Sequence, residues 1–165
     1  MKSGRRHDSL IPLSREHHYG LMVCLRIHRG LPQHGSDKAW LKDRARKAVA
    51  FFETGLVAHF RAEEEVVFPA MTMFSGAAAT LQQLTEEHRK LEGLIDRLRA
   101  APVNELGGLL AEFADLLEDH IRTEERVLFP VYEEQVSPQQ ALRVQQAVHD
   151  LIGDAGHFTR PDLLE

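Results

Sequence analysis

Residues 59–71 read HFRAEEEVVFPAM, and 61 positions later residues 120–132 read HIRTEERVLFPVY. In each stretch a His is followed four residues on by a Glu, then by apolar residues and a Phe-Pro pair; the pairs are His59 with Glu63 and His120 with Glu124. Residues four apart on a helix lie one above the other on one face. That face also carries apolar residues: Phe52, Leu56 and Val67 in the first stretch, and Phe113, Leu117 and Leu128 in the second. The pattern predicts two helices that each point a His and a Glu into a core.

Imidazole and carboxylate groups are costly to bury unless they are paired, hydrogen-bonded or bound to a metal. Two copies of the same buried His-Glu pair therefore predict a metal site inside a helical bundle.

Composition sets limits on the other function classes. The chain has 165 residues, the size of a single domain, and a net charge of -5, which argues against nucleic acid as the main partner. Its single cysteine, Cys24, excludes an intramolecular disulfide. The basic N-terminal residues are not followed by an apolar segment, so no signal peptide is expected. No apolar run approaches the roughly 18 residues of a membrane span, and a soluble cytoplasmic protein without membrane contact is expected.

Apolar residues recur with the 3.6-residue period of helices, and no alternating strand pattern is found. We expect an all-α, up-down-up-down four-helix bundle with an additional C-terminal helix, in one domain over residues 1–165. Ser14 is expected to cap the first helix, which should end near 30–32, and Pro130 to end or kink the fourth. The bundle should cover about 10–134, with helices over about 37–69, 77–99 and 105–134, a C-terminal helix over about 137–153 and an irregular tail over 154–165.

A second, weaker repeat relates the first and third helices at an offset of 71 and pairs His17 with His88. His18 pairs with Arg89 instead, which favours His17 as the inward-pointing residue. The chain then consists of two related hairpins, each with one lone His and one His-x-x-x-Glu. Packed about a pseudo-two-fold axis, they bring together the six predicted metal ligands: His17, His59, Glu63, His88, His120 and Glu124.

Four imidazoles and two carboxylates without thiolate favour iron or manganese. Six ligands are too many for one tetrahedral zinc ion. If Glu63 and Glu124 each bridge two metals, each metal has four protein donors, and a bridging oxo or hydroxo group makes five. A sixth position then stays open for dioxygen, nitric oxide, peroxide or azide.

The order lone His, His-x-x-x-Glu, lone His, His-x-x-x-Glu over residues 10–132 resembles the hemerythrin-like, or HHE cation-binding, domains. The resemblance implies two non-heme iron ions with four terminal His ligands and with Glu63 and Glu124 as bridges. Two departures distinguish this chain from the oxygen carriers. The third helix has Glu92 where the carriers have a fifth His, and the fourth has Glu124 where they have an Asp one residue later, at the place of Glu125. These departures favour iron or oxygen sensing, redox defence or nitric oxide handling over simple oxygen carriage.

Ferritin-like di-iron proteins, the nearest rival, use Glu-x-x-His. That interpretation fails because no Glu stands three residues before the predicted His ligands; those positions hold Ser14, Leu56, Thr85 and Leu117.

Other polar residues have simpler interpretations. Glu92 is open as an extra ligand, although its repeat partner is Leu21. Glu64 and Glu125 either face solvent or orient ligands from a second layer, whereas Glu65, Glu86 and Glu87 are expected to face solvent. Cys24, Tyr19 and Tyr132 are expected to pack in the core. The remaining histidines are interpreted as non-ligands: His7, His28, His34, His149 and His157.

Three functions follow from such a centre. The first is binding or sensing of dioxygen, nitric oxide or iron; it is favoured because the sequence offers no general acid, nucleophile or substrate pocket beyond the metal ligands. The second is a redox enzyme that reduces peroxide or nitric oxide, with His18 or Tyr19 as proton donor. The third is a structural site in which a metal such as zinc only holds the bundle together.

Overall fold

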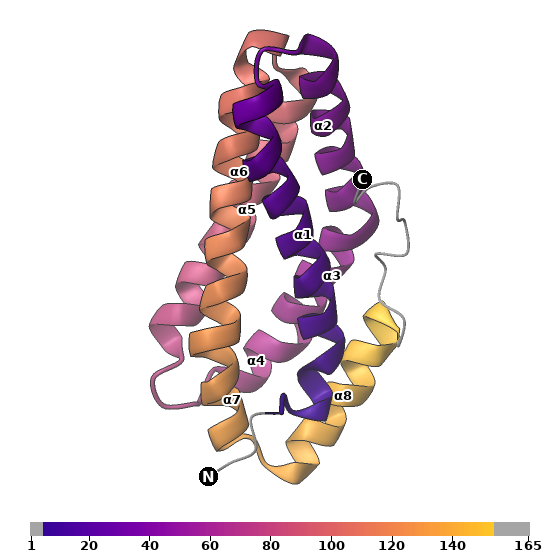
Figure 1. The fold of residues 1–165 in the computed structure, drawn as a ribbon. Helices are drawn as coiled ribbons and strands as arrows, with labels where there is room; N and C mark the ends of the chain where they lie inside the picture. Colours follow the sequence, from indigo (N-terminus) through magenta and orange to yellow (C-terminus); the bar gives the residue numbers. More distant parts are fainter. Residues whose placement is uncertain (1–4, 154–165) are drawn as a thin grey trace.

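The computed structural model describes residues 5–153, which form helices and their connections without a strand. Four long helical rods run up, down, up and down, and a fifth helix packs beside one end of the bundle (Figure 1). The fold class expected from the sequence is confirmed. The expected tail over 154–165 lies outside the described residues.

The rods have the following bounds. The first is the 3-10 turn η1 (Asp8–Leu10) followed by α1 (Ile11–His34). The second is continuous through α2 (Lys38–Phe51), η2 (Phe52–Leu56), α3 (Val57–Ala62), η3 (Glu63–Val67) and α4 (Phe68–Met71). The third is α5 (Ala78–Ala100), and the fourth joins α6 (Val103–Thr123), η4 (Glu124–Leu128) and α7 (Phe129–Gln135). The fifth helix is α8 (Pro138–Ile152).

Helix α1 is longer at both ends than the sequence pattern indicated. It begins at Ile11 instead of after Ser14, because Pro12 occupies the first turn, where its missing N–H is not needed. It also continues beyond Pro32 to His34, and Gly35 N–H closes the last turn on the Leu31 carbonyl at 2.8 Å. At the start of the second rod and of the fifth helix, the side chains of Asp37 and Ser137 accept backbone N–H groups and so cap the first turn.

Three wide π-helical turns interrupt the second and fourth rods, and the sequence pattern did not predict them. Two of them, η3 and η4, start at Glu63 and Glu124 and end just before Phe-Pro. The N–H of Phe68 reaches back to the Glu63 carbonyl, and that of Phe129 to the Glu124 carbonyl. Because an extra residue widens the turn ahead of each proline, the rods continue through Pro69 and Pro130 and do not end there.

The core consists of two apolar clusters with a polar layer between them. His17 lies between Leu13 of one cluster and Cys24 of the other, and His88 between Leu84 and Leu91. Helix α8 covers the cluster at the lower end with Val144, Val148 and Ile152. The fold therefore places a layer of buried polar side chains across the middle of the bundle.

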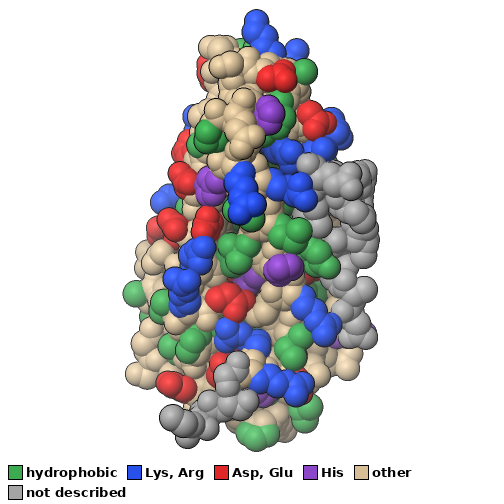
Figure 2. Space-filling model, in the orientation of Figure 1, with side chains coloured by type: hydrophobic (Ala, Val, Ile, Leu, Met, Phe, Trp, Pro, Cys, Tyr) green, Lys and Arg blue, Asp and Glu red, His purple; other side chains and the backbone are tan. Residues whose placement is uncertain are grey.

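The outer surface mixes both signs of charge, as Figure 2 shows for one face. Among residues 5–153, no helix is both long enough and apolar enough to cross a membrane.

Candidate metal centre

The six side chains singled out in the sequence lie together in the polar layer. All six are buried, none with more than 3% of its surface exposed. The four imidazoles come from four different rods: His17 from α1, His59 from α3, His88 from α5 and His120 from α6. Glu63 and Glu124 are the first residues of the wide turns η3 and η4. The sequence thus identified every member of this cluster, which we call the His-Glu cluster.

The His-Glu cluster divides into two groups of four possible ligands that share both carboxylates. The first group is His17, His59, Glu63 and Glu124; the second is Glu63, His88, His120 and Glu124. Within each group the candidate ligand atoms lie within 4.8 Å of one another. The arrangement has the geometry of two neighbouring cation positions with common carboxylates.

Glu63 reaches both groups with different oxygens. Its Oε1 lies 2.8 Å from Nε2 of His59, and its Oε2 lies 3.1 Å from Nε2 of His88. Glu124 Oε2 lies 3.0 Å from Nε2 of His17 and 3.6 Å from Nε2 of His120. Each carboxylate is therefore placed between two imidazoles that belong to different groups.

These residues fit a bound cation because their polar atoms are otherwise unsatisfied. Both carboxylate oxygens of Glu63 and both of Glu124 are buried without a hydrogen-bond partner. In addition, the Nε2 atoms of His17 and His59 face each other at 3.1 Å, as do those of His88 and His120. Such buried charges are costly, and cations between them would satisfy the carboxylates and the imidazole lone pairs together.

The second nitrogen of every imidazole is held by a glutamate. Nδ1 of His17 lies 2.6 Å from Glu125, that of His59 2.7 Å from Glu16, that of His88 2.7 Å from Glu64 and that of His120 2.8 Å from Glu87. Because a carboxylate only accepts hydrogen bonds, each Nδ1 carries the proton and donates. This tautomer leaves the Nε2 of a neutral imidazole free to bind a metal.

Two of these four supporting glutamates were missed. Glu87 was expected to face solvent, which is wrong: it is buried against His120. Glu16 was assigned no role by the sequence pattern, although its repeat partner is Glu87 and each directly precedes a His of the His-Glu cluster. Glu64 and Glu125 contact the imidazoles of His88 and His17, as the orienting alternative requires, and Glu65 and Glu86 are exposed as expected.

The imidazoles and carboxylates of this layer shift one another's pKa values. Burial disfavours the imidazolium form, yet the nearby carboxylates raise the pKa of His59 to about 9 and that of His17 well above its usual value. Burial likewise opposes ionisation of Glu63, but His59, His17 and His88 hold its pKa well below the usual range. The pKa of Glu125 falls to about 2 despite burial, because His17, Ser14 and Arg6 stabilise its carboxylate. Protons and metal cations would thus compete for the same atoms.

The remaining candidates do not join the His-Glu cluster. His18 is exposed, and Glu92 turns outward to Arg89, with 2.5 Å between Glu92 Oε1 and Arg89 Nη1. Tyr132 is buried with its hydroxyl 2.9 Å from that of Ser9, and Tyr19 packs on the apolar core. Cys24 is a buried core residue whose pKa burial raises to about 12.

The other histidines also lie elsewhere. His7 contacts Ser9, His28 contacts Asp115 at 2.8 Å, and His34 lies against Trp40. His149 belongs to neither ligand group, and His157 lies outside the described residues.

Comparison with known families also points to a cation-binding protein. Residues 12–132 match the family described as the Hemerythrin HHE cation binding domain. The chain belongs to this family. A second match of the hemerythrin HHE domain covers residues 81–157 and so begins in the third rod, at the start of the second hairpin.

The sequence of one curated protein matches part of this hemerythrin HHE chain. It is a protein named DNA nickase from Nostoc sp. (strain PCC 7120 / SAG 25.82 / UTEX 2576), 33% identical over 87 residues. The match covers 52% of this chain and 24% of the relative, so the chain spans only part of that protein's length. No solved structure matches the chain. Family membership, the two ligand groups and the unsatisfied carboxylates together indicate a metal-binding protein.

Proposed function

We propose that this chain is a non-heme di-iron protein that binds or senses a small molecule such as dioxygen or nitric oxide. The observation that carries the proposal is the division of six buried ligands into two groups sharing Glu63 and Glu124. Nitrogen and oxygen donors without thiolate favour iron over softer metals. A single tetrahedral zinc ion would leave part of this donor set unused.

The residues have separate parts in this proposal. His17 and His59 would hold one iron and His88 and His120 the other, and Glu63 and Glu124, which belong to both ligand groups, would serve both. Bound iron would supply reversible binding of a small ligand, or redox chemistry with it. The supporting glutamates keep each imidazole in the required tautomer, and the apolar clusters on either side keep bulk water away.

Binding is favoured over turnover by what surrounds the His-Glu cluster. Its neighbours among the described residues are the supporting glutamates and apolar or aromatic side chains such as Phe60 and Phe129. The residues considered as proton donors offer little support, since His18 is exposed and Tyr19 packs on the core. Reduction of peroxide or nitric oxide at the same centre is the alternative function.

The name of the Nostoc relative is not carried over to this chain. The shared part is 24% of that protein, and a net charge of -5 does not favour binding to DNA. We propose that the chain alone does not nick DNA, and incubation with supercoiled plasmid and divalent metal serves as the control.

Titration of the iron-loaded chain tests binding against turnover. We expect azide and nitric oxide to change the visible spectrum reversibly and to saturate, and Glu63→Ala to abolish the change. Sustained consumption of peroxide or nitric oxide with an electron donor, lost in the same variant, would establish the enzyme instead. A chain that takes up zinc and shows no spectral response would support the structural role.

A further inference from the structure

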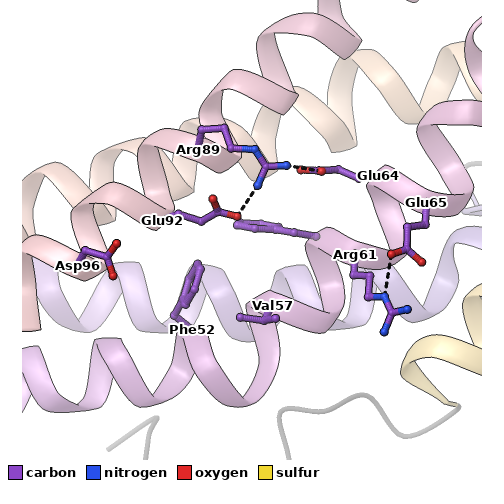
Figure 3. A pocket seen from close by; sticks show the side chains of 9 residues that line it. Phe52, Val57, Arg61, Glu64, Glu65, Arg89, Glu92 and Asp96 are labelled. Atoms are coloured by element: carbon purple, nitrogen blue, oxygen red, sulfur yellow. Dashed lines mark hydrogen bonds and ion pairs between the residues drawn. The ribbon is translucent and has the colours of Figure 1, made fainter.

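The two ends of the His-Glu cluster differ in how they are separated from solvent. A cavity of about 420 Å³ opens between the second rod and α5, lined by residues from Phe52 to Glu65 on one side and from Arg89 to Asp96 on the other. Figure 3 shows its charged rim, where Arg89 of α5 reaches both Glu64 and Glu92. This cavity, the α5 pocket, lies on the side of His88.

Two residues that line the α5 pocket also contact His88 of the His-Glu cluster: Glu64, which lies 2.7 Å from its Nδ1, and Phe60. Phe60 lines the pocket, and its ring stacks on the imidazole of His88 with 3.8 Å between centroids and 16° between planes. The same ring lies 5.7 Å from the imidazole of His120. A small molecule in the pocket is thus one side chain away from the two imidazoles of the second ligand group.

The repeat places different residues at the other end. The counterpart of Phe60 at an offset of 61 is Ile121, which is buried where α6 crosses α1. A Cβ added at Gly20 would lie 2.8 Å from the end of the Ile121 side chain, so the two helices meet closely there. On the same side, Arg6 and Ser14 cover Glu125, the glutamate that supports His17. Among residues 5–153, packed side chains from α1, α6 and the segment before η1 lie at that end.

We propose that a small uncharged molecule reaches the His-Glu cluster through the α5 pocket, at the end of His88 and His120, and that the ring of Phe60 controls its passage. The inference rests on the function proposed above. It makes the two halves of a nearly symmetric centre inequivalent. A molecule that enters from solvent meets the second ligand group first, and the first ligand group lies at the closed end.

The charge on the rim selects against anions. The pocket is lined by four carboxylates, from Glu64, Glu65, Glu92 and Asp96, against two guanidinium groups, from Arg61 and Arg89. Nitric oxide is therefore expected to enter independently of salt. Azide is expected to enter faster as salt screens the carboxylates.

A matched pair of cysteine variants tests the route. Val57 lines the α5 pocket and is 49% exposed, whereas Val127 on η4 is 48% exposed and is not among the residues that line it. Val57→Cys and Val127→Cys can each be labelled with a bulky maleimide, because the native Cys24 is buried with a raised pKa. Stopped-flow association of nitric oxide and of azide with the iron-loaded protein is then compared for labelled and unlabelled chains.

We expect the label at position 57 to slow association of nitric oxide by about tenfold, since it obstructs the route, and the label at position 127 to leave the rate unchanged. Equal rates in the two labelled variants would overturn this inference alone. Absence of any binding by the unlabelled chain would overturn the proposed function, and this inference with it.

A second variant acts on the ring itself. Phe60→Leu keeps an apolar residue in the core but replaces the ring with a smaller side chain, so association of nitric oxide should become several-fold faster. Ile121→Val, the corresponding change at the closed end, should leave the rate unchanged. Circular dichroism checks that both variants keep their helices. A faster association rate in Ile121→Val, or an unchanged association rate in Phe60→Leu, would contradict the route.

Discussion

The four imidazoles of the His-Glu cluster have both ring nitrogens engaged, unlike an ordinary buried histidine. Nδ1 donates to a glutamate, and Nε2 faces a second imidazole and a carboxylate that belongs to both ligand groups. Support of this kind fixes the ring orientation and raises the basicity of a ligand. The supporting glutamates should therefore matter for metal affinity although none of them belongs to either ligand group.

Glu87→Ala tests this support against an exposed neighbour. Removing the carboxylate that holds His120 should lower metal affinity by about 10- to 100-fold. Glu86→Ala makes the same chemical change one residue away, on the exposed face, and should leave affinity unaltered. Competition with a chromophoric chelator measures both. Equal affinities in the two variants would show that the contact to His120 has no role in metal binding.

The residues of the His-Glu cluster were predictable because the chain contains the motif twice. One buried His carries little information, but repeats at offsets of 61 and 71 assign all six positions together. Glu16 and Glu87 were not predicted to be buried, since they lie at the edge of the apolar face. At such an edge, the helical period does not distinguish a buried side chain from an exposed one.

At the scale of the elements, close approach between α1 and α2 depends on a glycine. The indole of Trp40 lies against the backbone of α1 at Gly30, and a Cβ there would overlap the ring. Gly93 in α5 has no neighbour within 4 Å of an added Cβ. The two glycines therefore predict opposite effects of the same substitution.

Gly30→Ala should lower the free energy of unfolding by about 1–3 kcal/mol, because the indole must move. Gly93→Ala should raise it by about 0.5–1 kcal/mol, since alanine favours the helix and meets nothing. Urea denaturation followed by circular dichroism measures both. Stabilisation by Gly30→Ala would show that Trp40 is not held against α1.

The helices themselves were predicted well and their irregularities were not. The apolar period located all five helices. The wide turns at Glu63 and Glu124 need one extra residue per turn, and a pattern judged against an ideal helix does not show it. Pro130 appeared to be a possible end of the fourth rod, whereas the wide turn ahead of it lets the helix continue.

At the scale of the whole molecule, the buried charges couple folding to metal and pH. In the metal-free protein the pKa of His59 is raised to about 9, above its value near 6.5 in the unfolded chain. Protonated His59 therefore stabilises the folded chain, and this contribution is complete at pH values below about 6.5. That contribution is lost as the pH rises towards 9. Metal binding displaces the same protons, so metal affinity should rise over this range and fall on acidification.

The difference in melting temperature between metal-loaded and metal-free protein should therefore grow from pH 6 to pH 9. Dialysis at pH 4–5 should release the metal as the imidazoles protonate. Differential scanning calorimetry and elemental analysis measure the two effects. A metal-to-protein ratio that is unchanged after acid dialysis would contradict the assignment of imidazole ligands.

The α5 pocket is a feature of the assembled molecule that the sequence does not reveal. It depends on the gap between the second rod and α5 and on the ring of Phe60, which a helical pattern identifies only as another core residue. The difference between Phe60 and Ile121 is visible in the aligned repeats, but its meaning requires the packed structure.

Iron content measured together with the visible spectrum, first under nitrogen and then in air, decides whether the six residues form a di-iron centre. We expect about two irons per chain, in line with the two ligand groups, and a near-ultraviolet band that appears on oxidation. Glu63→Ala, which removes a carboxylate common to both groups, should lose iron and the band. One zinc per chain, or a fully helical protein that takes up no metal, would contradict the di-iron centre.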